Sequence, residues 1–249
     1  LHIDAKVPFS EHALTYNLRK SKLYLVDRVK VNWGGASQIW AELNLIEAAL
    51  NIGGYGYLHL LTGIDLPLKT QSEIHDFFAK NNGKQFIYIE NKTPEWARDR
   101  IKYFYPFQEY FDRKNKFGNG IRKACVITQS LLGVNRIPQG MKIGLGSAYF
   151  DITEEFALYI MAQKGKVQQI FAKTFCADEM FIQTLYLNSR FNEAEGRYTY
   201  SGEKSWVAEQ YMNICRAVDW KRGQPYTYQD DDFNDLMLCG CNFARKFDM

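Results

Sequence analysis

Two early segments of the chain repeat hydrophobic residues at the spacing of a helix. We predict one helix over residues 36–50 and a second that begins near Ser72. Their apolar faces carry Ile39, Leu43, Ile46 and Leu50 in the first helix, and Ile74, Phe77 and Phe78 in the second. Short apolar runs predict strands over 22–33, 55–61 and 85–89. This alternation predicts an α/β fold in which helices cover both faces of a mostly parallel central sheet.

The second half of the chain continues the same pattern. We predict strands over 142–150 and 215–220, and helices over 151–162 and 230–239. No linker or repeat divides the sequence, so we expect a single domain over 1–249. Because residues 1–4 resemble the end of a strand, we also expect that a short N-terminal segment with the first strand is missing.

Composition narrows the function classes. The 249 residues are 46% hydrophobic, which is enough for a packed core, and the net charge of +3 without a Lys-Arg block predicts no nucleic-acid partner. The five cysteines are scattered and lack a paired spacing, which predicts neither a disulfide framework nor a zinc site. No apolar run reaches the ~20 residues that span a bilayer. A reducing, cytoplasmic location is expected.

The segment 173–191 carries the strongest candidate chemistry. Asp178 and Glu179 are adjacent at the start of a segment with helical periodicity, where Phe181 and Leu185 provide a buried face. Partial shielding from water raises a carboxyl pKa, which suits Glu179 to general-base catalysis. The alternative is that both acids only favour the start of a helix electrostatically.

Common catalytic motifs are absent from the sequence. It contains no Walker loop, GxGxxG, HExxH or GxSxG segment, and the four histidines have no metal spacing. Residues 230–232 form an Asp-Asp-Asp run that contains a DxD pattern, which in some sugar-nucleotide enzymes holds a divalent cation. The run precedes an apolar helical series, so we interpret it as a helix cap and predict no metal.

Six collinear segments resemble one family. They are HIDAK (2–6), WGGAS (33–37), LLTGIDLPLKT (60–70), RIPQGMKIGLGSAYF (136–150), CADEMFIQTLYLNS (176–189) and FARKFD (243–248). Together they resemble the core-2/I-branching β-1,6-N-acetylglucosaminyltransferases and the related peptide O-xylosyltransferases. The resemblance implies a GT-A type fold and an inverting transfer of a sugar, GlcNAc by this likeness, from a UDP-sugar to a glycan hydroxyl in β linkage. It implies no metal and no other cofactor.

The resemblance also assigns residues to roles. Glu179 matches the position of the catalytic base, and the adjacent Arg245 and Lys246 match a basic pair that binds the donor diphosphate. An arginine fork and a lysine point charge are suited to phosphate oxygens. The alternative for the basic pair is a solvated tail.

Four further residues have both a functional and a structural interpretation. By resemblance, Asp4 contacts the uridine and Trp33 lines the donor sugar pocket, whereas the alternatives are a turn former and a core residue. Asp65 either accepts hydrogen bonds from donor hydroxyls or sets the turn before Pro67. Trp220 either stacks on an acceptor sugar or belongs to the core.

Two departures from the family pattern bear on the expected substrate and location of the protein. Ala148 replaces the acidic residue that follows the serine in xylosyltransferases, which argues against xylosyl transfer. Lacking the disulfides of the lumenal enzymes, the chain resembles a bacterial-type member in polysaccharide biosynthesis, with a glycan or lipid-linked acceptor. The basic, aromatic stretch 96–123 is a hypothetical peripheral membrane contact at the inner face. Two alternatives stay open: a non-catalytic nucleotide-sugar or glycan-binding protein, and a metal-dependent glycosyltransferase that uses Asp230 or Asp232.

Overall fold

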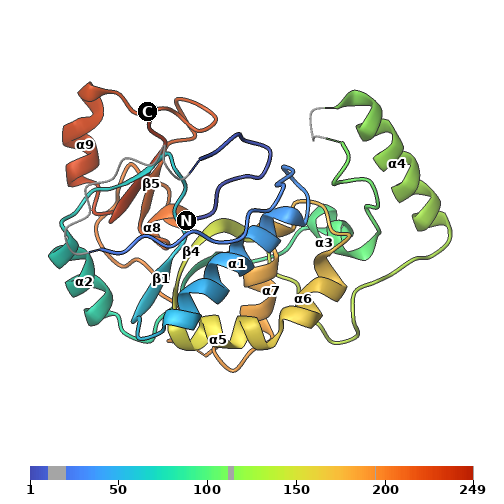
Figure 1. Cartoon of the computed structure of the whole chain (residues 1–249), viewed down its shortest axis with the longest axis horizontal. Helices are drawn as coiled ribbons and strands as arrows, with labels where there is room; N and C mark the ends of the chain where they lie inside the picture. The colour runs from blue at the N-terminus through green and yellow to red at the C-terminus, as the bar shows by residue number, and fades with distance from the viewer. Residues whose placement is uncertain (11–20, 112–114, 194, 249) are drawn as a thin grey trace. The chain divides into compact units, whose positions relative to one another are not determined.

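A computed structural model describes residues 1–10, 21–111, 115–193 and 195–248. The chain forms two compact units. Unit 1 comprises residues 1–53, 92–143 and 158–182, and unit 2 comprises residues 54–91, 144–157 and 183–249. Figure 1 shows the order of the helices and strands along the chain. The expectation of a single domain stays a prediction.

Unit 1 is built from helices and extended segments. Its helices are α1 (Ser37–Ile52), α3 (Glu95–Lys102), α4 (Lys116–Leu131), α6 (Lys164–Phe171) and the short 3-10 turn η2 (Ala177–Glu179). Helix α1 confirms the predicted helix over 36–50, because Ile39, Leu43 and Ile46 are buried at the predicted spacing. The helices α5 (Glu154–Ala162) and α7 (Phe181–Leu187) contain the unit boundaries.

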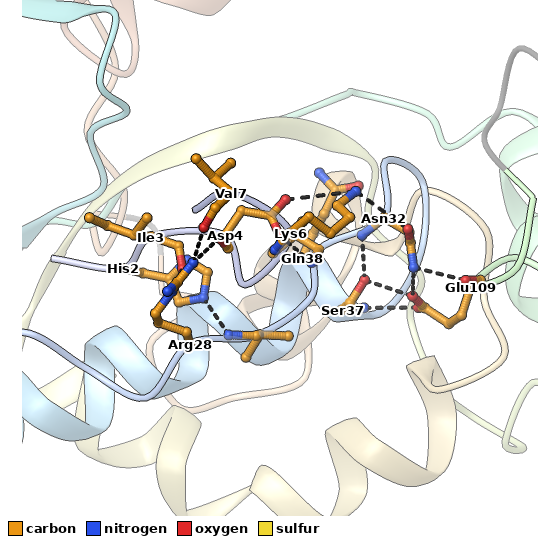
Figure 2. A network of polar contacts seen from close by, with 12 residues as sticks. His2, Ile3, Asp4, Lys6, Val7, Arg28, Asn32, Ser37, Gln38 and Glu109 are labelled. Carbon is orange, nitrogen blue, oxygen red and sulfur yellow. Dashed lines mark hydrogen bonds and ion pairs between the residues drawn. The ribbon is translucent and has the colours of Figure 1, made fainter. Parts of the chain in front are cut away.

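The predicted strand over 22–33 is wrong, since no strand is formed there in the described residues. Instead, an arginine ties this segment to the start of the chain (Figure 2). Arg28 donates from Nε to the Ile3 carbonyl (3.2 Å) and from Nη2 to the Asp4 carbonyl (2.7 Å). The backbone N–H of Val29 donates to His2 Nε2 (2.9 Å). Together with two backbone hydrogen bonds between the same segments, these side chains satisfy some of the backbone groups that a strand ladder would pair.

Unit 2 contains the two described sheets. The first has the order β1-β4-β3, formed by β1 (Tyr57–His59), β4 (Gly146–Thr153) and β3 (Phe86–Ile89), and both pairings are antiparallel. The second has the order β2-β6-β5, formed by β2 (Asp65–Pro67), β6 (Phe243–Arg245) and β5 (Arg216–Val218). In it, β2 and β6 are antiparallel and β5 and β6 are parallel. A mixed α/β fold is confirmed, whereas the mostly parallel central sheet is not.

One helix of unit 2 begins at a recognisable sequence signal. Helix α2 (Gln71–Lys80) starts with a capping box, in which Thr70 and Glu73 satisfy each other's backbone N–H groups. The remaining elements are α8 (Glu209–Met212), the 3-10 turn η3 (Asp230–Asp232) and α9 (Phe233–Leu238). An aromatic core cluster packs Ile74 and Phe78 of α2 against Phe86 of β3 and Phe243 of β6.

The glycines of the 142–150 segment allow close approach of backbones, as the sequence predicts. A Cβ added to Gly146 would lie 1.9 Å from the Tyr88 carbonyl oxygen, and one added to Gly144 would lie 2.6 Å from Gln183 Cβ. Neither position has room for a side chain. Gly146 therefore lets β4 approach β3 closely, and Gly144, just before β4, lets the chain approach α7.

Candidate functional site

The loop of residues 33–37 in unit 1 has a shape that requires its two glycines. Gly34 has φ of +82°, a left-handed conformation that glycine adopts without strain. At Gly35, an added Cβ would lie 2.5 Å from Glu109 Oε1. Trp33, which starts this loop, is 48% exposed, so the alternative of a core residue is wrong.

Glu109 fixes the loop by accepting several hydrogen bonds (Figure 2). Its Oε1 accepts from the Ser37 backbone N–H (3.0 Å), and its Oε2 accepts from Ser37 Oγ (2.7 Å) and Asn32 Nδ2 (3.1 Å). Ser37 Oγ in turn accepts from the Asn32 backbone N–H (2.9 Å). Sequence reasoning missed Glu109, because it lies 72 positions from Ser37 and belongs to no motif.

Asp4 is held by the backbone next to this loop. Its Oδ1 accepts from the backbone N–H groups of Lys6 (2.9 Å) and Val31 (3.2 Å), and its Oδ2 lies 3.7 Å from Lys6 Nζ (Figure 2). Partial burial acts to raise the pKa of Asp4, but these hydrogen bonds and the Lys6 charge outweigh it and lower the pKa. Asp4 therefore carries a negative charge and stabilises a turn, and its contact with uridine stays a prediction.

Gln38 connects the loop to the acidic pair. Its Oε1 accepts from the Gly34 backbone N–H (2.6 Å), and its Nε2 donates to Asp178 Oδ2 (3.0 Å). A backbone hydrogen bond from Cys176 N–H to the Gly34 carbonyl (2.9 Å) joins the same two segments. Two motifs that are 140 positions apart in sequence thus meet in unit 1.

Glu179 presents an accessible carboxylate. Its side chain is 41% exposed, and its Oε2 accepts a hydrogen bond from Arg100 Nη1 (2.7 Å). The guanidinium of Arg100 lies over the Trp96 ring, with 4.7 Å from Cζ to the ring centroid. A stacked arginine on α3 therefore orients the carboxylate while the opposite side stays open to solvent. Arg100 was not identified from the sequence.

Glu179 is partly shielded, as expected, but its neighbour Asp178 is the more deeply buried of the two carboxyls. The Asp178 residue is 9% exposed, and burial together with the Glu179 charge raises its pKa to about 6. Burial, with a contribution from Asp178, also raises the pKa of Glu42 well above its usual value. The Glu42 Oε2 atom is buried without a hydrogen-bond partner in the described part of the chain. Burial therefore makes the protonated form of each carboxyl more favourable than it is in water.

The raised pKa of Asp178 predicts a pH-dependent loss of stability. Because folding raises this pKa from 3.8 to about 6, the folded state binds the proton more tightly. Its stabilising effect is full below about pH 4 and is lost as the pH rises through about 6, a change of ~3 kcal/mol. We expect Asp178→Asn, which cannot ionise, to lose less stability than the wild type between these pH values.

Urea unfolding at a series of pH values measures this difference. The variant Asp76→Asn, at an exposed position of α2, is the matched control and should follow the wild-type profile. Parallel profiles for the wild type and Asp178→Asn would contradict the assignment of a raised pKa to Asp178.

In unit 2, Asp65 and Arg245 face each other across the pairing of β2 with β6. Arg245 Nε lies 3.8 Å from Asp65 Oδ1, and Asp65 Oδ2 accepts from the Thr62 backbone N–H (2.7 Å). Burial lowers the pKa of Arg245, and the Asp65 charge opposes that shift. Asp65 therefore both sets the turn before Pro67 and pairs with a candidate phosphate-binding residue.

A second arginine lies on β5 and was missed by sequence reasoning. Arg216 is fully buried, donates to the Leu60 carbonyl (2.6 Å) and lies 3.5 Å from Asp151 Oδ1. Asp151 also contacts His59 Nδ1 at 2.9 Å. A charged residue in a buried strand is rare unless it is paired, so Arg216 within the apolar run 214–218 was the signal to follow.

The guanidinium groups of Arg216 and Arg245 both lie near the ring of Tyr149. The Tyr149 ring centroid lies 5.0 Å from Arg216 Cζ and 4.7 Å from Arg245 Cζ. Among the described residues, the Nε atoms of both arginines are buried without a hydrogen-bond partner. Each guanidinium nevertheless has a carboxylate beside it, Asp151 for Arg216 (3.5 Å) and Asp65 for Arg245 (3.8 Å), so both charges are paired within unit 2.

The other predicted residues of unit 2 have simpler environments. Lys246 follows Arg245 and is half-buried, and its carbonyl accepts from the Tyr228 backbone N–H (3.0 Å). Trp220 is 53% exposed and lines a pocket, so its alternative of a core residue is wrong. Unit 1 thus holds Asp4, Trp33 and Glu179, and unit 2 holds Asp65, Arg245, Lys246 and Trp220. Asp65 and Arg245 are the predicted pair that the structure brings into direct contact.

The Asp-Asp-Asp run forms the 3-10 turn η3 and closes a capping box there, whereas Asp232 at the N-cap position of α9 makes no side-chain cap hydrogen bond to that helix. Asp232 Oδ2 accepts from the Gln229 backbone N–H (2.8 Å), and Asp232 Oδ1 accepts from Arg222 Nη1 (2.5 Å). Both oxygens of this carboxylate are therefore engaged within the protein. Across the described ranges, no cluster of three His, Cys, Asp or Glu residues has the geometry to hold a metal ion, and His12 lies outside those ranges. No helix described here has the length and apolarity that crossing a membrane requires.

Comparisons with known proteins agree on one group. The family model described as Core-2/I-Branching enzyme matches residues 1–237, which leaves the FARKFD segment (243–248) outside the match. Xylosyltransferase 2 from Pan troglodytes and from Homo sapiens are each 26% identical over 233 residues. Xylosyltransferase 1 from Rattus norvegicus is 24% identical over 233 residues.

Each of these alignments covers 89% of this chain. They cover 25% of both xylosyltransferase 2 proteins and 26% of the xylosyltransferase 1 protein. The chain therefore spans about a quarter of the length of the curated relatives it matches.

Proposed function

Because this chain belongs to the Core-2/I-branching enzyme family, we propose that it is a glycosyltransferase that moves a sugar from a UDP-sugar to a hydroxyl of a glycan acceptor. The observation that carries the proposal is the adjacent basic pair Arg245 and Lys246 in unit 2, whose side chains, unlike the fully buried Arg216, keep some exposed surface. A diphosphate carries the oxygens that such cationic side chains bind. The accessible carboxylate of Glu179 supplies the second requirement of the reaction, a proton acceptor.

In the proposed reaction, the acceptor hydroxyl attacks the anomeric carbon as its proton passes to Glu179. The bond from that carbon to the UDP oxygen breaks on the opposite face, which inverts the configuration and gives a β linkage. Arg100 holds the Glu179 carboxylate through its hydrogen bond and so orients the base.

The leaving group becomes more negative as this bond breaks. Arg245 and Lys246 are proposed to stabilise that charge on the diphosphate. Fixed cations in a buried setting are pre-oriented, so they lower the barrier without reorganising during the reaction. The proposed reaction therefore needs no metal ion.

GlcNAc is the proposed donor sugar, by resemblance to the branching acetylglucosaminyltransferases. The xylosyltransferase names of the relatives make UDP-xylose the competing donor. The proposed acceptor is a glycan, free or lipid-linked, that serves as a precursor of a surface polysaccharide.

Release of UDP from a panel of UDP-sugars tests the proposal. The panel contains UDP-GlcNAc, UDP-xylose, UDP-glucose and UDP-glucuronate, each with glycan acceptors and with or without excess EDTA. We expect turnover of UDP-GlcNAc that EDTA does not reduce, because protein cations bind the diphosphate. The other possible results would each contradict a different part of the proposal: the donor sugar, the metal independence or the transfer itself.

Turnover of UDP-xylose instead would replace the donor sugar and keep glycosyl transfer. Activity that disappears in EDTA and returns with Mn²⁺ would support the metal-dependent alternative. Tight UDP-sugar binding without any turnover would identify a non-catalytic binding protein.

A further inference from the structure

Helix α4 is attached to the rest of unit 1 along one face. A Cβ added to Gly118 would lie 2.5 Å from Phe111 Cβ, so this side of the helix packs against Phe111. About three turns further on, Gln129 lies on the same side. Its Oε1 accepts from the Phe104 backbone N–H (2.7 Å), and its Nε2 donates to the Phe104 carbonyl (2.9 Å). The opposite side of the helix points away from these contacts.

The side of α4 that points away carries large apolar side chains. Phe117, Ile127 and Leu131 are each 60% exposed or more. At about 100° per residue, these three positions fall within about 80° of the helix circumference, on the side away from the attached face. Together with Leu132 at the C-cap, which is also exposed, they form the outer face of α4. Exposed apolar residues that cluster in this way mark an interaction site, whereas single ones are ordinary.

The charged residues of α4 are all basic. They are Lys116, Arg122 and Lys123, and the helix sequence contains no Asp or Glu. Arg122 belongs to the attached face, where its Cζ lies 4.2 Å from the centroid of the Phe175 ring. Both lysines are exposed, and by helical spacing they lie within about 40° of Ile127 around the helix axis. Lysines therefore border the outer face, and the helix carries no carboxylate to neutralise them.

An amphipathic helix with this arrangement suits the interface of a membrane. Its apolar side chains can enter the boundary between head groups and acyl chains, while its lysines meet anionic head groups. A second copy of the chain fits less well. A two-fold contact between outer faces would bring the lysines of both copies together, and like charges without a carboxylate partner oppose association.

From these observations we propose that the outer face of α4 docks on an anionic lipid surface, with the helix axis parallel to that surface. The composition of residues 96–123 indicates a membrane contact, but Tyr103 and Tyr105 of that stretch are buried, and the outer face continues to Leu132. The contact is therefore confined to one face of one helix. This inference does not depend on UDP-sugar turnover, and it would place the chain where a lipid-linked acceptor is found.

Flotation of the chain with phosphatidylcholine vesicles, with and without phosphatidylglycerol, tests the proposal. We expect flotation with the vesicles that contain phosphatidylglycerol, and less of it at high salt, because salt screens the lysine contacts. Leu131→Ser and Ile127→Ser should each weaken binding about tenfold or more, since less apolar surface leaves water. The double variant Lys116→Gln and Lys123→Gln should weaken it by a similar factor and reduce its salt dependence.

Matched controls lie at exposed positions of unit 2. Leu238→Ser removes an 85% exposed leucine from α9, and Lys80→Gln removes an exposed lysine from α2. Both should float as the wild type does. Because all of the substituted side chains are exposed, every variant should keep the wild-type melting temperature.

Three results would overturn the proposal. They are the absence of flotation with phosphatidylglycerol, equal flotation with phosphatidylcholine alone, and wild-type flotation of both Leu131→Ser and Ile127→Ser. A dimer in light scattering that Leu131→Ser converts to a monomer would identify a second copy as the occupant and would also overturn it. Flotation as expected without any UDP-sugar turnover would overturn the proposed function and leave the docking face standing.

Discussion

Replacing Glu179 by Gln is expected to lower the rate of sugar transfer by ~1,000-fold, since a general base contributes roughly 10²–10⁴ in rate. Glutamine has the shape of glutamate and can still accept the hydrogen bond from Arg100, which is 2.7 Å long in the wild type. It cannot take up the proton of the acceptor hydroxyl. We therefore expect kcat to fall while UDP affinity and thermal stability stay near their wild-type values.

The matched control for this prediction is Glu95→Gln. Glu95 lies on α3 in the same unit, and its side chain is 74% exposed. The same chemical change there should leave kcat unaltered. Wild-type turnover in Glu179→Gln would exclude Glu179 as the base and would direct attention to Asp178, the adjacent carboxyl with the raised pKa.

Removal of the Lys246 charge is expected to reduce transfer by ~100-fold, because one pre-oriented group that stabilises developing charge contributes roughly 10²–10³. Lys246 is half-buried, so Lys246→Ala should fold. Arg245 requires a gentler change, since its loss would leave the buried Asp65 carboxylate without its cation. Arg245→Lys keeps the charge but loses the fork, and we expect it to lower kcat by ~10-fold.

These variants are compared with Lys204→Ala, which removes an exposed cation from the same unit. Steady-state kinetics with the best donor of the panel, together with UDP titration, gives kcat and affinity separately. Equal kcat in Lys246→Ala and Lys204→Ala would show that Lys246 does not stabilise the leaving group.

The helices were predictable because burial follows local spacing. Ile39, Leu43 and Ile46 recur at helical intervals, and the structure buries all three on α1. Thr70 and Glu73 similarly form the capping box that starts α2. Where local spacing alone determines the conformation of a segment, a single sequence is sufficient to predict that conformation.

Residues 22–33 show where local pattern is not sufficient. Their alternation favours a strand, but Arg28 and Asp4 bind backbone groups that a strand would use for pairing. The same limit applies to Glu109 and Arg100, whose roles depend on partners 72 and 79 positions away in sequence. Long-range hydrogen bonds of this kind leave no periodic signal in a single sequence.

The adjacent acids Asp178 and Glu179 show that a sequence can locate a site without showing which side chain is buried. Sequence position identifies Asp178 and Glu179 together but does not determine which carboxyl is buried. The structure buries Asp178 against Gln38 and leaves Glu179 accessible beside Arg100. Neighbouring residues in a 3-10 turn point in different directions, so a shift of one position exchanges their environments.

The central claim is that protein cations, rather than a metal ion, bind the diphosphate of the donor. A structure of the chain with bound UDP, from crystals grown in excess EDTA, tests this claim most directly. We predict diphosphate oxygens within ion-pair distance of Arg245 and Lys246. A diphosphate that binds only after Mn²⁺ is supplied, bridged by that ion to the carboxylates of residues 230–232, would contradict the account.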